Sequence, residues 1–133
     1  MDEAPDHATA ARAAHPAAER SRLIFFVGAD PKVDPGPVEA ARHMATVAGE
    51  AGLEGEIRLA TGAVRALEMG MLEGLPETIS LTACPRSMGN LDLSEERARA
   101  AGARPRRLAE IITEVADGRS VLIPVAHRVD GEA

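Results

Sequence analysis

Cys84 is the only cysteine among the 133 residues of the chain, and its neighbours make it the first candidate for chemistry. It follows a β-prone run over 79–83, in which apolar residues alternate with serine and threonine, and it precedes Pro85. Because proline cannot donate to a sheet ladder, the run predicts a short strand that ends at Cys84. Ligands and chemistry gather at the carboxyl ends of the strands in a parallel α/β sheet. Cys84 is therefore predicted to lie where such a sheet places its functional groups.

A cysteine reacts as its thiolate, and the residues after Cys84 could stabilise that anion. Arg86 brings a positive charge two residues on, and the backbone N–H groups that begin with those of Arg86 and Ser87 could converge on the sulfur. The same donors would suit a persulfide anion. Arg86 and Ser87 are thus the predicted anion-stabilising residues. A buried, inert cysteine that caps the strand is the alternative, and the residues alone leave both open.

Other kinds of site find little support in the sequence. His43 lies within a predicted helix and His127 follows the last predicted strand, so neither is placed to act as a base for Cys84. The four histidines lack the spacing of metal ligands, and we predict no metal site. The turn after the first strand lacks the glycine pattern and the lysine of phosphate-binding loops, so we expect no nucleotide and no other cofactor.

Three residues at the same predicted edge are candidates for lining a crevice beside Cys84. Gly28 and Asp30 follow the first strand, and Gly62 follows the second. Apart from this role, Asp30 and the nearby Lys32 are expected to be solvated loop charges. A basic cluster at the start of a later helix also predicts a solvated face, and it comprises Arg104, Arg106 and Arg107.

Composition argues against two classes of partner. The formal net charge is −6, and the two phenylalanines are the only aromatic residues. An acidic protein without stacking platforms is poorly suited to nucleic acid or to anionic membrane surfaces. No apolar run has the length of a signal peptide or of a membrane span, and a lone cysteine cannot form an internal disulfide. We therefore expect a cytoplasmic protein that binds neither nucleic acid nor membranes.

The rest of the chain alternates strands with helices. Apolar runs predict strands over 22–27, 56–60, 79–83 and 120–125, with a brief candidate at 103–104. Helical spacing and capping residues predict helices over 37–51, 61–69, 94–102 and 105–118. Such alternation implies a three-layer α/β/α sandwich around a mostly parallel sheet of roughly four to five strands. We expect a disordered tail over 1–21, a single α/β domain over 22–126 and a loose tail over 127–133.

Three segments together resemble the DsrE-like sulfur-relay family, which includes DsrE, DsrF and the TusBCD subunits. They are the first strand with its turn, RLIFFVGAD, the second strand with its helix start, EIRLATGAVRALEMG, and the third strand with its cysteine, TACPRSMGN. The helix start Gly-Ala-Val of the family is matched at 62–64, and its cysteine after the third strand is matched by Cys84. The likeness runs from about Arg22 to Val125.

The resemblance implies a small α/β domain that assembles into oligomers and, in some members, carries sulfur as a persulfide on a cysteine. That role would fall on Cys84. Its thiolate would accept a sulfane sulfur from a donor and pass it to an acceptor thiol, by the attack of sulfur on sulfur seen in thiol–disulfide exchange. The implied partners are sulfur donor and acceptor proteins or small persulfides, together with further copies of the chain. Whether such a carrier is an enzyme, a sulfurtransferase, stays open.

Two other functions are compatible with the sequence. The first is a non-catalytic oligomeric subunit that docks a partner protein and uses Cys84 as a structural residue. Its docking surface would be the apolar cluster over 69–75, which otherwise predicts core packing. The second is a sensor that binds a small ligand in the crevice above the sheet.

Overall fold

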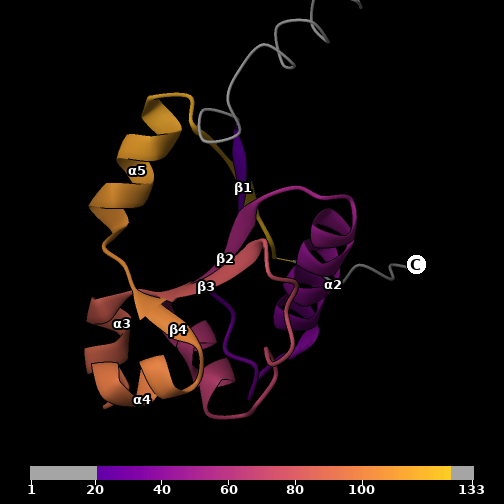
Figure 1. Cartoon of the computed structure of the whole chain (residues 1–133). Coiled ribbons are helices and arrows are strands. Elements are labelled where there is room, and N and C mark those ends of the chain that lie inside the picture. Colours follow the sequence, from indigo (N-terminus) through magenta and orange to yellow (C-terminus); the bar gives the residue numbers. More distant parts are fainter. Residues whose placement is uncertain (1–20, 127–133) are drawn as a thin grey trace, which may run out of the picture.

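Five parallel strands form one sheet at the centre of the computed structural model, which describes residues 21–126 (Figure 1). They lie in the order β4-β3-β2-β1-β5, so the first strand is paired on both sides. The bounds are β1 Arg22–Val27, β2 Gly55–Leu59, β3 Ile79–Ala83, β4 Ala103–Pro105 and β5 Ser120–Pro124. The brief candidate at 103–104 therefore does form a strand, and the predicted α/β/α sandwich is confirmed.

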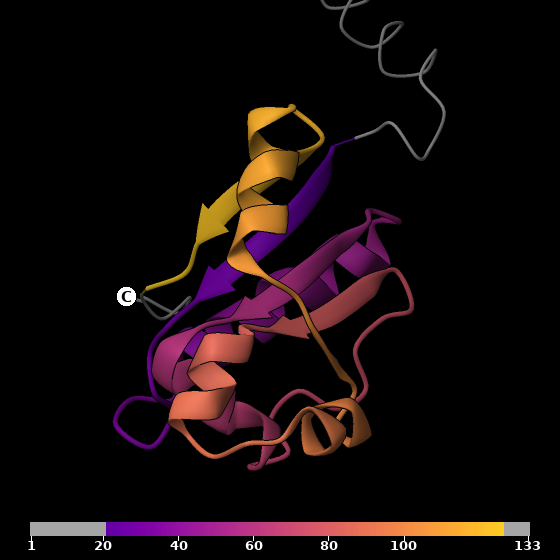
Figure 2. The same cartoon turned by 90° about the vertical axis from the view of Figure 1, so that its left-hand side faces the viewer.

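Helices cover both faces of this sheet. They are α2 Gly36–Glu50, the 3₁₀ helix η2 Thr61–Leu67, α3 Pro85–Asn90, α4 Glu95–Ala100 and α5 Leu108–Ala116. α2 lies on one face, and Figure 2 shows α3 and α5 in front of the other. Within 21–126, no helix has both the length and the apolar character needed to cross a membrane. The tails predicted over 1–21 and 127–133 lie outside the described residues, except for Ser21.

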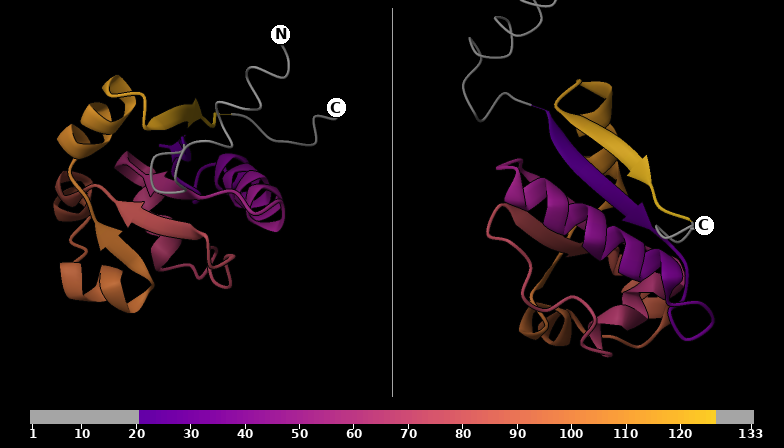
Figure 3. Two further views of the ribbon diagram at one scale, coloured as in Figure 1. Left: turned by 45° about the horizontal axis from the view of Figure 1, so that its top comes forward. Right: turned by 90° about the vertical axis from the view of Figure 1, so that its right-hand side faces the viewer.

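The face beneath α2 forms the apolar core. Phe25, Ile57 and Leu81 are register partners on β1, β2 and β3, and all three are buried. α2 covers this face with small residues on one side of the helix, which lets it pack close to the sheet (Figure 3). Its buried side chains include Val38, Ala41, Ala45 and Ala48. The helix is followed by a glycine with a φ of +80°, Gly52, as its sequence predicts.

The opposite face of the sheet carries a buried charge network. Glu56 of β2 is completely buried, and its carboxylate accepts hydrogen bonds from Thr82 Oγ1 at 2.7 Å and from Arg106 Nη1 at 2.5 Å. Arg22 Nη1 lies 3.4 Å from the same carboxylate. The Arg106 guanidinium also pairs with Glu114 of α5. We call these five residues the Glu56 cluster.

Arg106 departs most clearly from the sequence-based expectation. A solvated face was the prediction for its basic cluster, and for Arg106 this is wrong, because the residue is only 4% exposed. Its N–H donates to Ala83 O at 3.0 Å, which prolongs the pairing of β4 with β3 by one residue. From this extended position its side chain reaches Glu56. The chain therefore stays extended past Pro105, where a helix was predicted to start, and α5 begins only at Leu108.

We expect Glu56→Gln to lower the free energy of unfolding by about 3 kcal/mol, because it removes the buried counter-charge of Arg106. Chemical denaturation at neutral pH measures the change. Asp117→Asn is the matched control, since Asp117 pairs with Arg119 where both side chains are more than half exposed. This control should cost less than about 1 kcal/mol. Equal effects of the two substitutions would contradict the role assigned to Glu56.

Candidate functional site

Cys84 is held at the junction of β3 and α3. Its N–H donates to Leu59 O at 3.0 Å, which continues the pairing of β3 with β2, and its carbonyl oxygen accepts from Met88 N–H at 2.9 Å. The sequence predicts a loop after Cys84, but Pro85 begins a helix, because its missing N–H costs nothing in the first turn. The backbone of Cys84 is thus fixed on both sides, while the residue stays partly exposed.

Three hydrogen-bond donors of α3 act on the Cys84 sulfur, namely the N–H of Ser87, the hydroxyl of Ser87 and the N–H of Arg86. Burial raises the pKa of the thiol, but these hydrogen bonds and the positive charge of Arg58 outweigh burial, so the pKa of Cys84 lies below its ordinary value. A larger fraction of this thiol is therefore ionised at neutral pH than in a free cysteine. Arg86 acts through its backbone, and its side chain is exposed.

Thr61 orients the hydroxyl of Ser87. Its N–H donates to Ser87 Oγ at 2.7 Å, which leaves the hydroxyl proton free to point at the sulfur. Thr61 has a φ of +48°, a left-handed conformation that is rare for β-branched residues. Its own hydroxyl donates across to Gly28 O at 2.6 Å. The sequence predicts a helix over 61–69, and Thr61 is the strained first residue of the shorter 3₁₀ helix η2.

The loop after β1 is fixed against η2 by Asp30. Its Oδ2 lies 2.9 Å from Arg65 Nε, and its Oδ1 accepts from the N–H of Lys32 at 2.9 Å. Asp30 is therefore half-buried and paired, not the solvated charge expected from the sequence. Gly62 packs directly against it, and a Cβ added at Gly62 would lie 2.6 Å from Asp30 Cβ. The loops that follow β1, β2 and β3 thus meet at one edge.

Arg58 is the residue of this site that sequence reasoning missed. It lies on β2 and is only 1% exposed, and its Nη1 donates to the carbonyl oxygen of Arg106. Its Nε has no hydrogen-bond partner among the described residues. Burial lowers the pKa of Arg58, whereas the charges of Cys84 and Glu56 and a hydrogen bond to Cys84 act to raise it. The sequence did contain one signal for this residue. Glu56 and Arg58 carry opposite charges two residues apart, so they lie on the same face of an otherwise apolar strand.

The charges beneath Cys84 do not balance among the fully buried groups. The guanidinium groups of Arg58 and Arg106 are both almost fully buried, but only one carboxylate, that of Glu56, is buried with them. Glu114 pairs with Arg106 from a partly exposed position. The positive charge of Arg58 acts to lower the pKa of Cys84, so this setting favours a thiolate or a persulfide anion.

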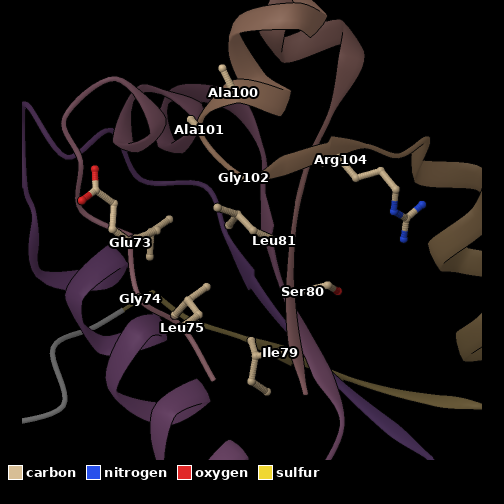
Figure 4. Close-up of a pocket in the computed structure, with 11 residues that line it drawn as sticks. Glu73, Gly74, Leu75, Ile79, Ser80, Leu81, Ala100, Ala101, Gly102 and Arg104 are labelled. Carbon is tan, nitrogen blue, oxygen red and sulfur yellow. The ribbon is translucent and has the colours of Figure 1, made fainter. Parts of the chain in front are cut away.

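A separate pocket lies at the other end of β3. It has a volume of about 460 Å³ and opens between the segment around Leu75, the start of β3 and the turn at Gly102 (Figure 4). Glu73 and Arg104 stand on opposite sides of it. Cys84 and its hydrogen-bonding partners do not line it. Within 21–126, no three side chains of His, Cys, Asp or Glu converge as metal ligands would.

The apolar cluster over 69–75 contributes to the core. Leu72 is buried, and Met71 and Leu75 pack against the core while partly exposed. Met69 is the exposed member. This segment therefore offers a partner protein little apolar surface.

The thiol pKa predicts the pH dependence of alkylation. We expect the rate of reaction of Cys84 with iodoacetamide to reach half its maximum at a lower pH than for a free cysteine. Ser87→Ala removes one donor to the sulfur, so it should move this midpoint to higher pH and slow the reaction at neutral pH. Ser80→Ala, a change of the same kind four residues before Cys84 on β3, should leave the midpoint unmoved. Coincident profiles for all three proteins would contradict the assigned hydrogen bonds.

Gly62 should tolerate no side chain. Because a Cβ there would overlap Asp30, we expect Gly62→Ala to lower the free energy of unfolding by about 2 kcal/mol. Gly89→Ala is the control within α3, where a Cβ meets no atom within 4 Å. That change should be neutral or raise stability by up to about 1 kcal/mol. Thermal and chemical unfolding of both variants would decide the point, and a harmless Gly62→Ala would refute the close approach.

Comparison with known proteins establishes the fold alone. No protein-family model matches the chain, and no curated protein matches its sequence. Among solved structures, the chain is similar to a conserved protein of unknown function from Bacteroides thetaiotaomicron, with a TM-score of 0.57 at 12% sequence identity. The similarity covers 77% of this chain and 94% of that one. At 12% identity, this structural similarity supports a shared α/β architecture and nothing beyond it. The family resemblance noted in the sequence stays a prediction.

Proposed function

We propose that this protein is a sulfur carrier, which holds a persulfide on Cys84 and passes the outer sulfur to a partner thiol. The observation that carries the proposal is the setting of the Cys84 sulfur. It receives donors from Arg86 and Ser87, lies near the buried charge of Arg58 and keeps partial exposure. A site that stabilises an anion and still admits a second sulfur compound is what persulfide transfer requires.

Loading is an exchange between two sulfur–sulfur bonds. The Cys84 thiolate attacks the outer sulfur of a donor persulfide, a new bond forms between the two sulfurs, and the donor's own sulfur–sulfur bond breaks. The donor leaves as a thiolate. The transferred sulfur brings the proton of the donor persulfide with it, and loss of that proton to water leaves the negative charge on the outer sulfur of the loaded Cys84. No external oxidant or reductant is needed. The N–H groups of Arg86 and Ser87 can hold either the thiolate or the persulfide.

Unloading reverses the roles. The thiolate of an acceptor attacks the outer sulfur of the loaded Cys84, and Cys84 leaves as a thiolate. A lowered thiol pKa makes Cys84 a better leaving group, so the same hydrogen bonds that favour loading also favour release. One cysteine is sufficient for both steps. The partners are donor and acceptor proteins or small persulfides, and we place the carrier in the cytoplasm, where reducing conditions keep a single thiol free.

A non-catalytic subunit that docks a partner protein is the second candidate function. The observation in its favour is an exposed apolar surface on α5 and β5, not the segment over 69–75 that the sequence suggests. In that case Cys84 would be structural and would react slowly with alkylating reagents. The two functions are therefore separable by the reactivity of one thiol.

The sulfur-carrier function is tested by the mass of the intact protein. We expect incubation with a sulfane-sulfur donor to add the mass of one sulfur atom, and reductant should remove it. Cys84→Ser should show no gain, because no other cysteine exists in the chain. Ser87→Ala should load more slowly at neutral pH than Ser80→Ala, because the hydroxyl of Ser87 donates to the sulfur and that of Ser80 does not.

Circular dichroism of Cys84→Ser provides the control for folding in this experiment. Loading that persists in a folded Cys84→Ser protein would refute the carrier function. A wild-type protein that gains no sulfur and resists alkylation would favour the docking subunit.

A further inference from the structure

The stretch of chain around Cys84 carries positive charge, although the protein as a whole is acidic. The formal net charge is −6, yet no acidic residue lies between Glu77 and Asp92. Arg86 is exposed in this stretch, and its side chain makes no hydrogen bond or ion pair with another residue of 21–126. The N–H of the same residue reaches the sulfur. The charge of the Arg86 side chain is therefore available to a molecule that approaches Cys84.

The neighbouring loops add no free negative charge at this edge of the sheet. Asp30 is the only acidic residue in 28–33 and 60–67, the segments that follow β1 and β2. Its carboxylate is paired with Arg65. Lys32, on the first of these loops, is exposed. These two segments thus present a cation, and no unpaired carboxylate, on the side of the sheet where Cys84 lies.

A further positive charge lies beneath the sulfur. Arg58 is only 1% exposed, and a hydrogen bond links it to Cys84. Its Nε–H has no partner within the part of the chain that the structure describes, and a buried donor without a partner costs free energy. A group that is held at a cost to stability is expected to serve the site that it faces. Arg58 supplies charge from below the sulfur, and Arg86 supplies it from the surface.

Cations on both sides of the sulfur matter most for a donor that is itself negatively charged. Attack by a thiolate on such a donor brings like charges together, and this repulsion raises the barrier. Positive groups that are already in place offset the repulsion as the two reactants meet. A neutral donor meets no such repulsion and gains little from an exposed arginine.

We propose, on the basis of the sulfur-carrier function proposed above, that Cys84 takes its sulfur from small anionic donors and that Arg86 is the residue that selects them. Thiosulfate is the simplest donor of this class. The Cys84 thiolate attacks its outer sulfur, a new sulfur–sulfur bond forms, and the bond to the inner sulfur breaks. Sulfite leaves with the electron pair of that bond, and the outer sulfur keeps its negative charge on the loaded Cys84. The step needs no proton, oxidant or reductant.

Two alkylating reagents that differ in charge test this selectivity. Iodoacetate and iodoacetamide react with the same thiolate, so the ratio of their rate constants is independent of the thiol pKa and reports the charge at the site. We expect this ratio to be higher for the wild type than for N-acetylcysteine amide, a neutral thiol. Arg86→Gln should lower the ratio about fivefold at low ionic strength. High salt should reduce the difference.

Arg119→Gln is the matched control. It removes the same charge just before β5, at the opposite edge of the sheet, from a side chain that is 55% exposed. This change should leave the ratio of the two rate constants unaltered. The intact mass after incubation with thiosulfate gives a second readout, in which Arg86→Gln should load about fivefold more slowly than Arg119→Gln. Arg86 is exposed, so its substitution should leave the protein folded, which circular dichroism checks.

The proposed donor class and the carrier function can fail separately in these experiments. A wild-type ratio no higher than that of the neutral thiol overturns the donor class, and so does an Arg86→Gln protein that keeps the wild-type ratio. A protein that gains sulfur but has no preference for iodoacetate refutes the donor class alone. A protein that prefers iodoacetate but gains no sulfur from any donor refutes the carrier function, and the donor class with it.

Discussion

The buried carboxylate of Glu56 is the constraint on which the rest of this structure depends. A carboxylate with no exposure to water needs hydrogen-bond donors and a counter-charge, and the fold supplies them from distant parts of the chain. Thr82 comes from the neighbouring strand, and Arg106 from the end of β4. The requirement for Arg106 explains why the chain stays extended through 106 and why α5 starts late. One charge on a central strand thus determines how two later elements are placed.

The same constraint extends to the cysteine. The guanidinium of Arg106 binds Glu56, and the carbonyl oxygen of Arg106 accepts a hydrogen bond from Arg58. The position of Arg106 therefore fixes that of the Arg58 side chain. Arg58 in turn contributes to the low pKa of Cys84. The reactivity of the thiol therefore rests on a polar layer within the sheet as well as on the short helix that follows it. A histidine base is not part of this arrangement within the described residues.

Features that repeat along the chain were predictable, and contacts between distant residues were not. Alternation of strands and helices was sufficient for the three-layer fold, and Pro85 was sufficient to place Cys84 at a strand end. Arg58 and Arg106 are 48 residues apart, and no local pattern shows that a side chain of one meets the backbone of the other. The helix α3 was missed because six residues are too few to show a helical period. Asp30 was misjudged because its partner, Arg65, lies on another element.

The position of β1 between β2 and β5 has a consequence for the order in which the molecule is built. β1 can pair with β2 once the chain has been made as far as Leu59. Its other edge stays unpaired until β5 has been made, because that edge pairs with β5 from Arg22 opposite Ser120 onward. Synthesis proceeds from the amino end, so a nascent chain carries an unpaired edge on β1 until β5 emerges, and its Glu56 lacks the counter-charge of Arg106 until that residue has been made. Closure of such distant segments is slow. The sheet should therefore be completed only after β5 has left the ribosome, and chains cut short before that strand are natural targets for chaperones and proteases.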